Sequence, residues 1–101
     1  MKQIDYISKA LTDFRLAAAV QVAATECGDY KKGNNAFDRV IHILKYLKGL
    51  GEMNELEALL SDSNVGVRMF AAYGLLSTSP KIAVPVLKEI SQRFPYRKSY
   101  T

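Results

Sequence analysis

Apolar residues recur along this chain at steps of three and four, which is the spacing of one face of an α-helix. The first such stripe consists of Ile4, Ile7, Leu11, Phe14, Ala18 and Val22. The helix is expected to end near Cys27-Gly28, because glycine adopts the left-handed conformation of a C-terminal cap at little cost. Asp29 then offers an N-cap. A second helix is predicted to run from there to about Lys48, with the Gly-Leu-Gly at 49–51 closing it.

Three shorter helices are predicted in the second half of the chain. The first runs from Met53 to about Leu60 and the next from Val65 to about Ser77, where Asp62 or Ser63 can act as its cap. The last begins around Ser79-Pro80 and ends at Arg93, and Pro85 is expected to kink it or to push its start later. The expected buried positions of these later helices and of the second one are Phe37, Val40, Ile41, Leu44, Leu47, Leu56, Leu59, Leu60, Val67, Ala71, Leu75, Val84, Leu87 and Ile90.

These patterns predict an all-α protein of about five helices in stacked antiparallel hairpins. The whole chain, 1–101, is expected to be one domain, with 94–101 a short basic-aromatic tail. Its 101 residues, 49% of them hydrophobic, suffice for one core. No segment approaches the roughly 18 apolar residues of a membrane span, and the N-terminus does not resemble a signal peptide. A cytoplasmic protein is therefore expected.

Residues 56–76, LEALLSDSNVGVRMFAAYGLL, resemble a HEAT repeat. The resemblance lies in the paired leucines, in Asp62 of the turn, and in the Val67-Arg68 and Ala71-Ala72 pairs of the following helix. It implies a fragment of a right-handed α-solenoid, in which hairpins stack on one another. In such repeats the turn aspartate and the arginine brace the turn by a charged hydrogen bond, which implies the same role for Asp62 and Arg68.

A wider resemblance covers about residues 8–93. The order GDYKKGN at 28–34, FDRV at 37–40 and STSP at 77–80 is similar to a bacterial HEAT-like family of unknown function, numbered two thousand and nineteen. That family carries no known enzymatic activity. Its members commonly continue into a further short helix, where this chain has FPYRKSYT. In size and architecture the chain is also similar to the small immunity proteins of bacterial toxin–immunity pairs.

Catalytic chemistry is not indicated by the sequence. His42 is the only histidine and Cys27 the only cysteine. Asp38 lies one helical turn before His42, a spacing more typical of a solvated helix face than of a catalytic pair. Cys27 is interpreted as a small buried hydrophobe. No metal-binding spacing is present, and neither a metal, a cofactor nor an enzymatic activity is expected.

Two binding functions of different classes remain. As an immunity protein, the chain would bind a cognate toxin domain, which could be a nuclease with a basic cleft, through an acidic patch with an aromatic anchor. The candidate residues are Glu52, Glu55, Glu57, Asp62 and Tyr73, and further tyrosines that could serve as anchors are Tyr30, Tyr46, Tyr96 and Tyr100.

The alternative is a nucleic-acid-binding module with a basic surface. Its candidate residues are Lys31, Lys32, Arg39, Lys45 and Lys48, with Arg93, Arg97 and Lys98 at the other end of the chain. The net charge of +4 is spread along the chain, so it permits an anionic partner without requiring one. A homodimer formed through the open ends of the stack is compatible with either function.

Overall fold

The computed structural model describes residues 2–93, and the side chains of 6–92 within that range. The fold is all-α, as predicted. Its elements are α1 (Lys2–Glu26), α2 (Tyr30–Leu50), the 3₁₀ helix η1 (Met53–Ser61), α3 (Val65–Leu75) and α4 (Pro80–Arg93). No strand occurs within the described range. The predicted tail at 94–101, with Tyr96, Arg97, Lys98 and Tyr100, lies outside it.

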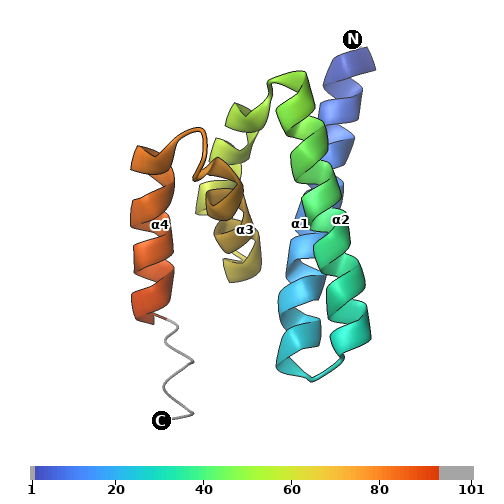
Figure 1. The fold of residues 1–101 in the computed structure, drawn as a ribbon, viewed down its shortest axis with the longest axis vertical. Helices are drawn as coiled ribbons and strands as arrows, with labels where there is room; N and C mark the ends of the chain where they lie inside the picture. The colour runs from blue at the N-terminus through green and yellow to red at the C-terminus, as the bar shows by residue number, and fades with distance from the viewer. Residues whose placement is uncertain (1, 94–101) are drawn as a thin grey trace.

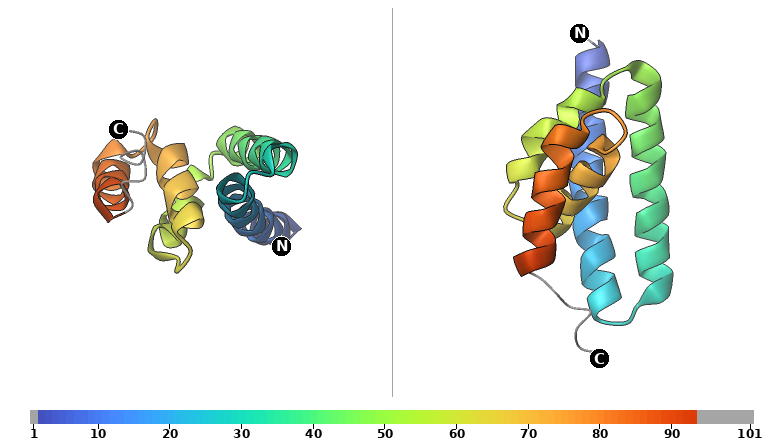
Figure 2. Two further views of the ribbon diagram at one scale, coloured as in Figure 1. Left: turned by 90° about the horizontal axis from the view of Figure 1, so that it is seen from below. Right: turned by 60° about the vertical axis from the view of Figure 1, so that its left-hand side comes forward.

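Successive helices alternate in direction and form three layers (Figure 1). The α1–α2 hairpin is the first layer, η1 and α3 are the second, and α4 is the third. Seen from below, the three layers lie in a row, with α3 between the first hairpin and α4 (Figure 2). This central position gives α3 two faces to bury, and its Val67, Ala71, Ala72 and Leu75 are at most 1% exposed.

The predicted turn signals set the ends of the long helices. Gly28 and Gly51 have φ angles of +83° and +73°, in the left-handed region where a side chain would be strained. The Asp29 side chain accepts a hydrogen bond from the Lys32 backbone N–H at 3.1 Å and caps α2. The predicted end of α1 and start of α2 are thereby confirmed, and α2 continues to Leu50, slightly past its predicted end near Lys48.

The third predicted helix is a 3₁₀ helix. With three residues per turn, positions three apart lie one above another, and the buried residues of η1 are Met53, Leu56 and Leu59. Leu60, which a 3.6-residue period would bury beside Leu56, is only partly buried. The change from 3.6 to three residues per turn thus decides that Leu59, rather than Leu60, faces the core.

Two other predictions about helix ends need correction. The cap of α3 is Asn64, whose Oδ1 accepts hydrogen bonds from the backbone N–H groups of Gly66 at 2.8 Å and Val67 at 3.2 Å. Neither Asp62 nor Ser63 fills that position. The last helix begins at Pro80 and continues through Pro85, so Pro85 does not delay its start.

The core runs between the layers. Its fully buried large side chains are Phe14, Leu47, Leu56, Leu75, Val40 and Val67. Two expected positions differ, since Phe37 and Val84 are both 39% exposed. Ile43, which was not expected, is buried. Phe37 still contacts α3, since its ring centroid lies 6.1 Å from that of Phe70.

Candidate functional site

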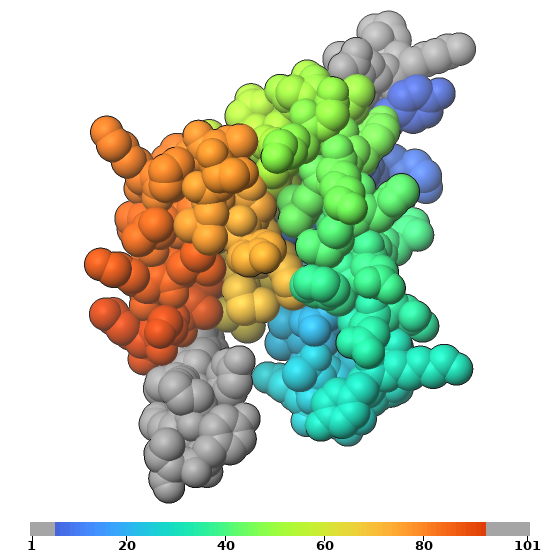
Figure 3. Space-filling model, in the orientation of Figure 1, coloured from blue at the N-terminus to red at the C-terminus, as the bar shows by residue number. Residues whose placement is uncertain are grey.

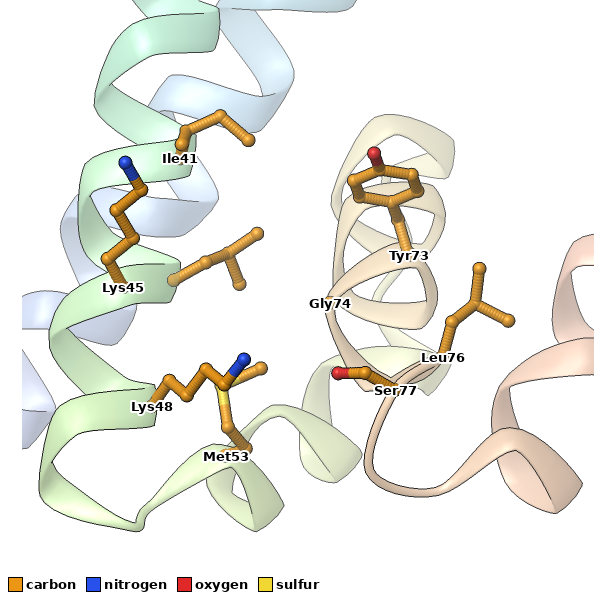
Figure 4. A pocket seen from close by; sticks show the side chains of 9 residues that line it. Ile41, Lys45, Lys48, Met53, Tyr73, Gly74, Leu76 and Ser77 are labelled. Carbon is orange, nitrogen blue, oxygen red and sulfur yellow. The ribbon is translucent and has the colours of Figure 1, made fainter.

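An open groove of about 350 Å³ lies between α2 and the C-terminal half of α3. On the surface, α2 and α3 meet across a shallow seam (Figure 3). In close-up, Ile41, Lys45 and Lys48 follow one edge along α2, and Tyr73 and Ser77 lie on the other, with the Leu76 side chain farther from α2 (Figure 4). The remaining lining residues are Leu44, Met53 and Gly74.

The floor of the groove is apolar, and Gly74 lets its walls come together. A Cβ built on Gly74 would lie 2.7 Å from Leu44 Cδ2 and 3.1 Å from Leu56 Cδ1. Leu44 and Met53 are both 8% exposed, so they belong to the core at the same time as they line the groove. The floor is therefore built from fixed core side chains and is formed before anything binds.

The edges carry the polar groups. Tyr73 is 55% exposed and Lys45 and Lys48 are exposed as well. Neither lysine forms an ion pair within the described residues. The nine lining residues include these two lysines and no carboxylate, so the lining itself carries a net positive charge.

The acidic candidate residues do not join this groove, although Tyr73 does. Glu55 and Glu57 lie in η1, and Glu52 is the residue just before it. Glu57 is exposed and the other two are half-buried. None of the predicted acidic residues, Asp62 included, lines the groove with Tyr73.

The carboxylate of Asp62 is already engaged by groups of its own fold. Its Oδ1 accepts a hydrogen bond from Arg15 Nε at 2.9 Å and lies 2.7 Å from Arg15 Nη2. Its Oδ2 accepts a hydrogen bond from the Asn64 backbone N–H at 3.0 Å. The Asp62 side chain is only 9% exposed. Its carboxylate thus ties the turn to α1 and has little capacity left for a partner.

The predicted bond between Asp62 and Arg68 exists in a different form. Arg68 Nη1 donates to the backbone carbonyl oxygen of Asp62 at 2.8 Å, whereas the carboxylate pairs with Arg15. The hydrogen bond from the Asn64 N–H holds the pKa of the Asp62 carboxyl below its usual value; burial opposes this shift, and Arg15 reinforces it. The long-range partner was missed because Arg15 is 47 residues away.

The basic candidate residues divide between two faces of the first hairpin. Lys45 and Lys48 line the groove, whereas Lys32 and Arg39 line a second hollow between α1 and α2, of about 420 Å³. Arg39 Nη2 lies 3.3 Å from Asp13 Oδ2, in an ion pair at that hollow. Lys31 is exposed near the start of α2 and lines neither hollow. No single continuous row of phosphate-binding side chains results.

The candidates for chemistry lie apart from the groove. Cys27 is exposed, which corrects its interpretation as a buried hydrophobe: it directly follows Glu26, the last residue of α1. His42 is exposed on α2. Within the described residues no three His, Cys, Asp or Glu side chains are grouped as metal ligands would be, and no polar or charged residue is buried. No helix of the described range is long and apolar enough to cross a bilayer.

Sequence reasoning placed Tyr73, Lys45 and Lys48 in competing hypotheses, whereas the structure brings the three together. Ser77 was missed, although it follows Tyr73 at a four-residue spacing that puts both at one helix edge. Lys45 and Lys48 show the matching three-residue spacing on α2. Comparison of the chain with protein-family models, curated proteins and solved structures found no match. The resemblance to the HEAT-like family therefore stays a prediction.

Proposed function

We propose that this protein is a non-enzymatic, HEAT-like protein-binding module that receives a partner in the groove between α2 and α3. The observation that carries the proposal is the combination of an apolar, preformed floor with an exposed aromatic side chain at its rim. Interface centres in proteins have this composition, with tyrosine as a frequent anchor. Because Leu44 and Met53 are already fixed by the core, binding would cost little ordering of the groove itself.

As a biological role we retain the neutralisation of a cognate bacterial toxin, on the basis of size and all-helical architecture. The groove is positively charged, so it is complementary to an acidic surface of such a toxin rather than to the basic cleft of a nuclease. Binding outside the toxin's own nucleic-acid cleft would block the toxin by steric exclusion or by holding an inactive conformation.

The test is affinity capture of tagged protein from its native cells, with and without nuclease treatment and at raised salt. The wild type is compared with Tyr73→Ala and with the matched control Tyr30→Ala. Tyr30 is 69% exposed and does not line the groove. A stoichiometric protein that survives nuclease and is lost only with Tyr73→Ala supports the proposal. Recovery of nucleic acid alone, released by salt, would overturn it in favour of the nucleic-acid alternative.

A further inference from the structure

The charge of the groove and the spacing of its lysines allow a more specific statement about its occupant. Lys45 and Lys48 are three residues apart on α2, so their Cα atoms are separated by about 4.5 Å along the helix axis. Carboxylates three or four residues apart on a second helix repeat at a similar interval. The α2 edge from Ile41 to Lys48 extends about 10 Å, which corresponds to two turns of such a helix.

The two edges differ in chemistry. The α2 edge presents two ammonium groups, and the α3 edge presents the hydroxyl groups of Tyr73 and Ser77 (Figure 4). Between the edges, the floor accepts apolar side chains. A partner helix that places large apolar residues at i and i+3 or i+4 into the floor would bring acidic residues on one flank to the lysines.

We infer that the groove binds an acidic amphipathic helix of a partner protein, with its carboxylates on Lys45 and Lys48 and its apolar anchors over Leu44, Met53 and Gly74. This inference rests on the proposed function, since it names the chemistry of the partner at the same groove. The source of the specificity is the unpaired charge. Lys45 and Lys48 repel each other, and the groove lining contains no carboxylate that would offset this repulsion. Carboxylates on the partner would reduce it.

A single-stranded nucleic acid is the competing anion, and the arrangement of the described residues disfavours it. Such ligands require a row of cationic groups along the backbone and a series of aromatic platforms for successive bases. The groove offers one tyrosine and two lysines above an aliphatic floor. Lys32 and Arg39, which would have to extend the row, belong to the second hollow, where Arg39 is paired with Asp13.

The experiment uses the full chain and three fluorescent probes in low salt. The first is a 16-residue helical peptide with leucines at heptad spacing and glutamates on both flanks. The second has lysine in place of every glutamate, and the third is an oligothymidylate of twelve nucleotides. Binding is followed by fluorescence anisotropy, and the site is mapped by amide chemical-shift changes in ¹⁵N-labelled protein. Lys45→Glu/Lys48→Glu is compared with the control Lys31→Glu/Lys81→Glu, which reverses two exposed lysines outside the groove.

We expect the acidic peptide to bind, with shift changes at Ile41, Tyr73 and Leu76, and to bind about tenfold more weakly to Lys45→Glu/Lys48→Glu. The control variant should bind it within about twofold of the wild type, because its charges lie away from the groove. The groove variant should in turn bind the basic peptide more tightly than the wild type does.

Preference of the wild type for the basic peptide, or equal loss in both double variants, would overturn the acidic-helix inference while leaving a protein-binding groove in place. Tighter binding of the oligonucleotide at the same residues would also overturn it. Absence of shift changes at the groove with every probe would refute the inference as well. The proposed function has its own test: it fails when affinity capture yields no protein that is lost with Tyr73→Ala.

Discussion

The two sides of α3 that face the first hairpin are built in opposite ways. Against α1, the backbone of α3 approaches so closely that a Cβ on Gly66 would lie 2.7 Å from Val22 Cγ2 and 3.0 Å from the Ala18 carbonyl oxygen. The Arg15–Asp62 ion pair joins α1 to the turn between η1 and α3, close to this contact. Against α2, Gly74 meets the end of the Leu44 side chain, and the groove beside this contact is open.

This difference separates stability from binding within one helix. The α1 side of α3 is closely packed and fixes the angle between α3 and α1, so it holds the second layer, η1 and α3, against the α1–α2 hairpin. On the α2 side, an open groove with an apolar floor does not destabilise the fold, because the floor residues also pack in the core. Variants on the α1 side are therefore expected to change stability, and variants on the α2 side to change binding.

Gly66→Ala should have the largest effect. Three atoms obstruct the added Cβ, and one of them is the backbone oxygen of Ala18, which cannot rotate away. Helix α3 must therefore shift from α1, at a cost of about 2–3 kcal/mol in the free energy of unfolding. Urea denaturation followed by circular dichroism measures this loss. The matched control is Gly49→Ala in α2, where nothing lies within 4 Å of the added Cβ. It should be neutral or more stable by up to about 1 kcal/mol. Equal stability of the two variants would mean that the α1–α3 contact is not close.

Asp62→Ala should come next, with a loss of about 1–2 kcal/mol. The substitution removes both the acceptor for the Asn64 N–H and the partner of Arg15, and because Arg15 is 52% exposed the ion pair itself contributes the smaller part. A double-mutant cycle with Arg15→Ala measures that part by urea denaturation. A coupling free energy of zero would show that Arg15 does not brace the turn.

The pH dependence of stability should identify the same carboxylate. Its pKa is lower in the folded chain than in the unfolded one, so the unfolded state binds more protons as the pH falls. The stabilisation is complete at neutral pH and is lost below about pH 4, as the pH falls through the folded-state pKa. The difference in stability between the wild type and Asp62→Asn, measured by thermal melts from pH 7 to pH 3, should shrink over that acidic range. If the difference in stability stays constant with pH, the effect of Asp62→Asn comes from the shape of the side chain rather than from its charge.

Gly74→Ala should cost less than Gly66→Ala, although the closest distance is also 2.7 Å. The obstructing atoms here are terminal methyl groups of Leu44 and Leu56, which can rotate, and alanine favours the helix. The unfolding free energy is expected to stay within about 1 kcal/mol of the wild type. The methyl group that Gly74→Ala adds also fills part of the groove floor, so binding of the acidic peptide should weaken. A stability loss as large as that of Gly66→Ala would erase the contrast between the two sides of α3.

Lys45→Glu/Lys48→Glu should change stability least, by no more than about 0.5 kcal/mol, because both side chains are exposed and unpaired in the described structure. Thermal melts in parallel with the binding measurements would check this. A large destabilisation would mean that the lysines serve the fold, and the loss of binding would then have no separate interpretation.

Local signals predicted the helices well and their contacts less well. Gly28, Asp29 and Gly51 act through their own backbone, so the ends of α1 and α2 could be read from the sequence. Phe37 and Val84 fit an apolar stripe, yet both are 39% exposed, because the width of the buried face depends on which neighbour covers it. Neither the 3₁₀ period of η1 nor the Arg15 partner of Asp62 has a local signature.

The candidate site shows the same limit. Exposed aromatic and cationic residues could be named from the sequence, but their grouping could not. Tyr73 was assigned with the acidic residues of η1, and Lys45 and Lys48 with the basic residues near the start of α2. The groove instead combines residues 25 or more positions apart, from the end of α2 and the end of α3.

By itself, the sequence determined the all-α class and the ends of the two long helices, because helix periodicity and capping are set by neighbours within one or two turns. Tertiary structure decided that Gly66 closes one side of α3, that Asp62 binds Arg15, and that Lys45, Lys48 and Tyr73 face one groove. These features depend on the packing angle of α3 against the first hairpin. That angle follows from the shapes of many side chains at once, which no local pattern records.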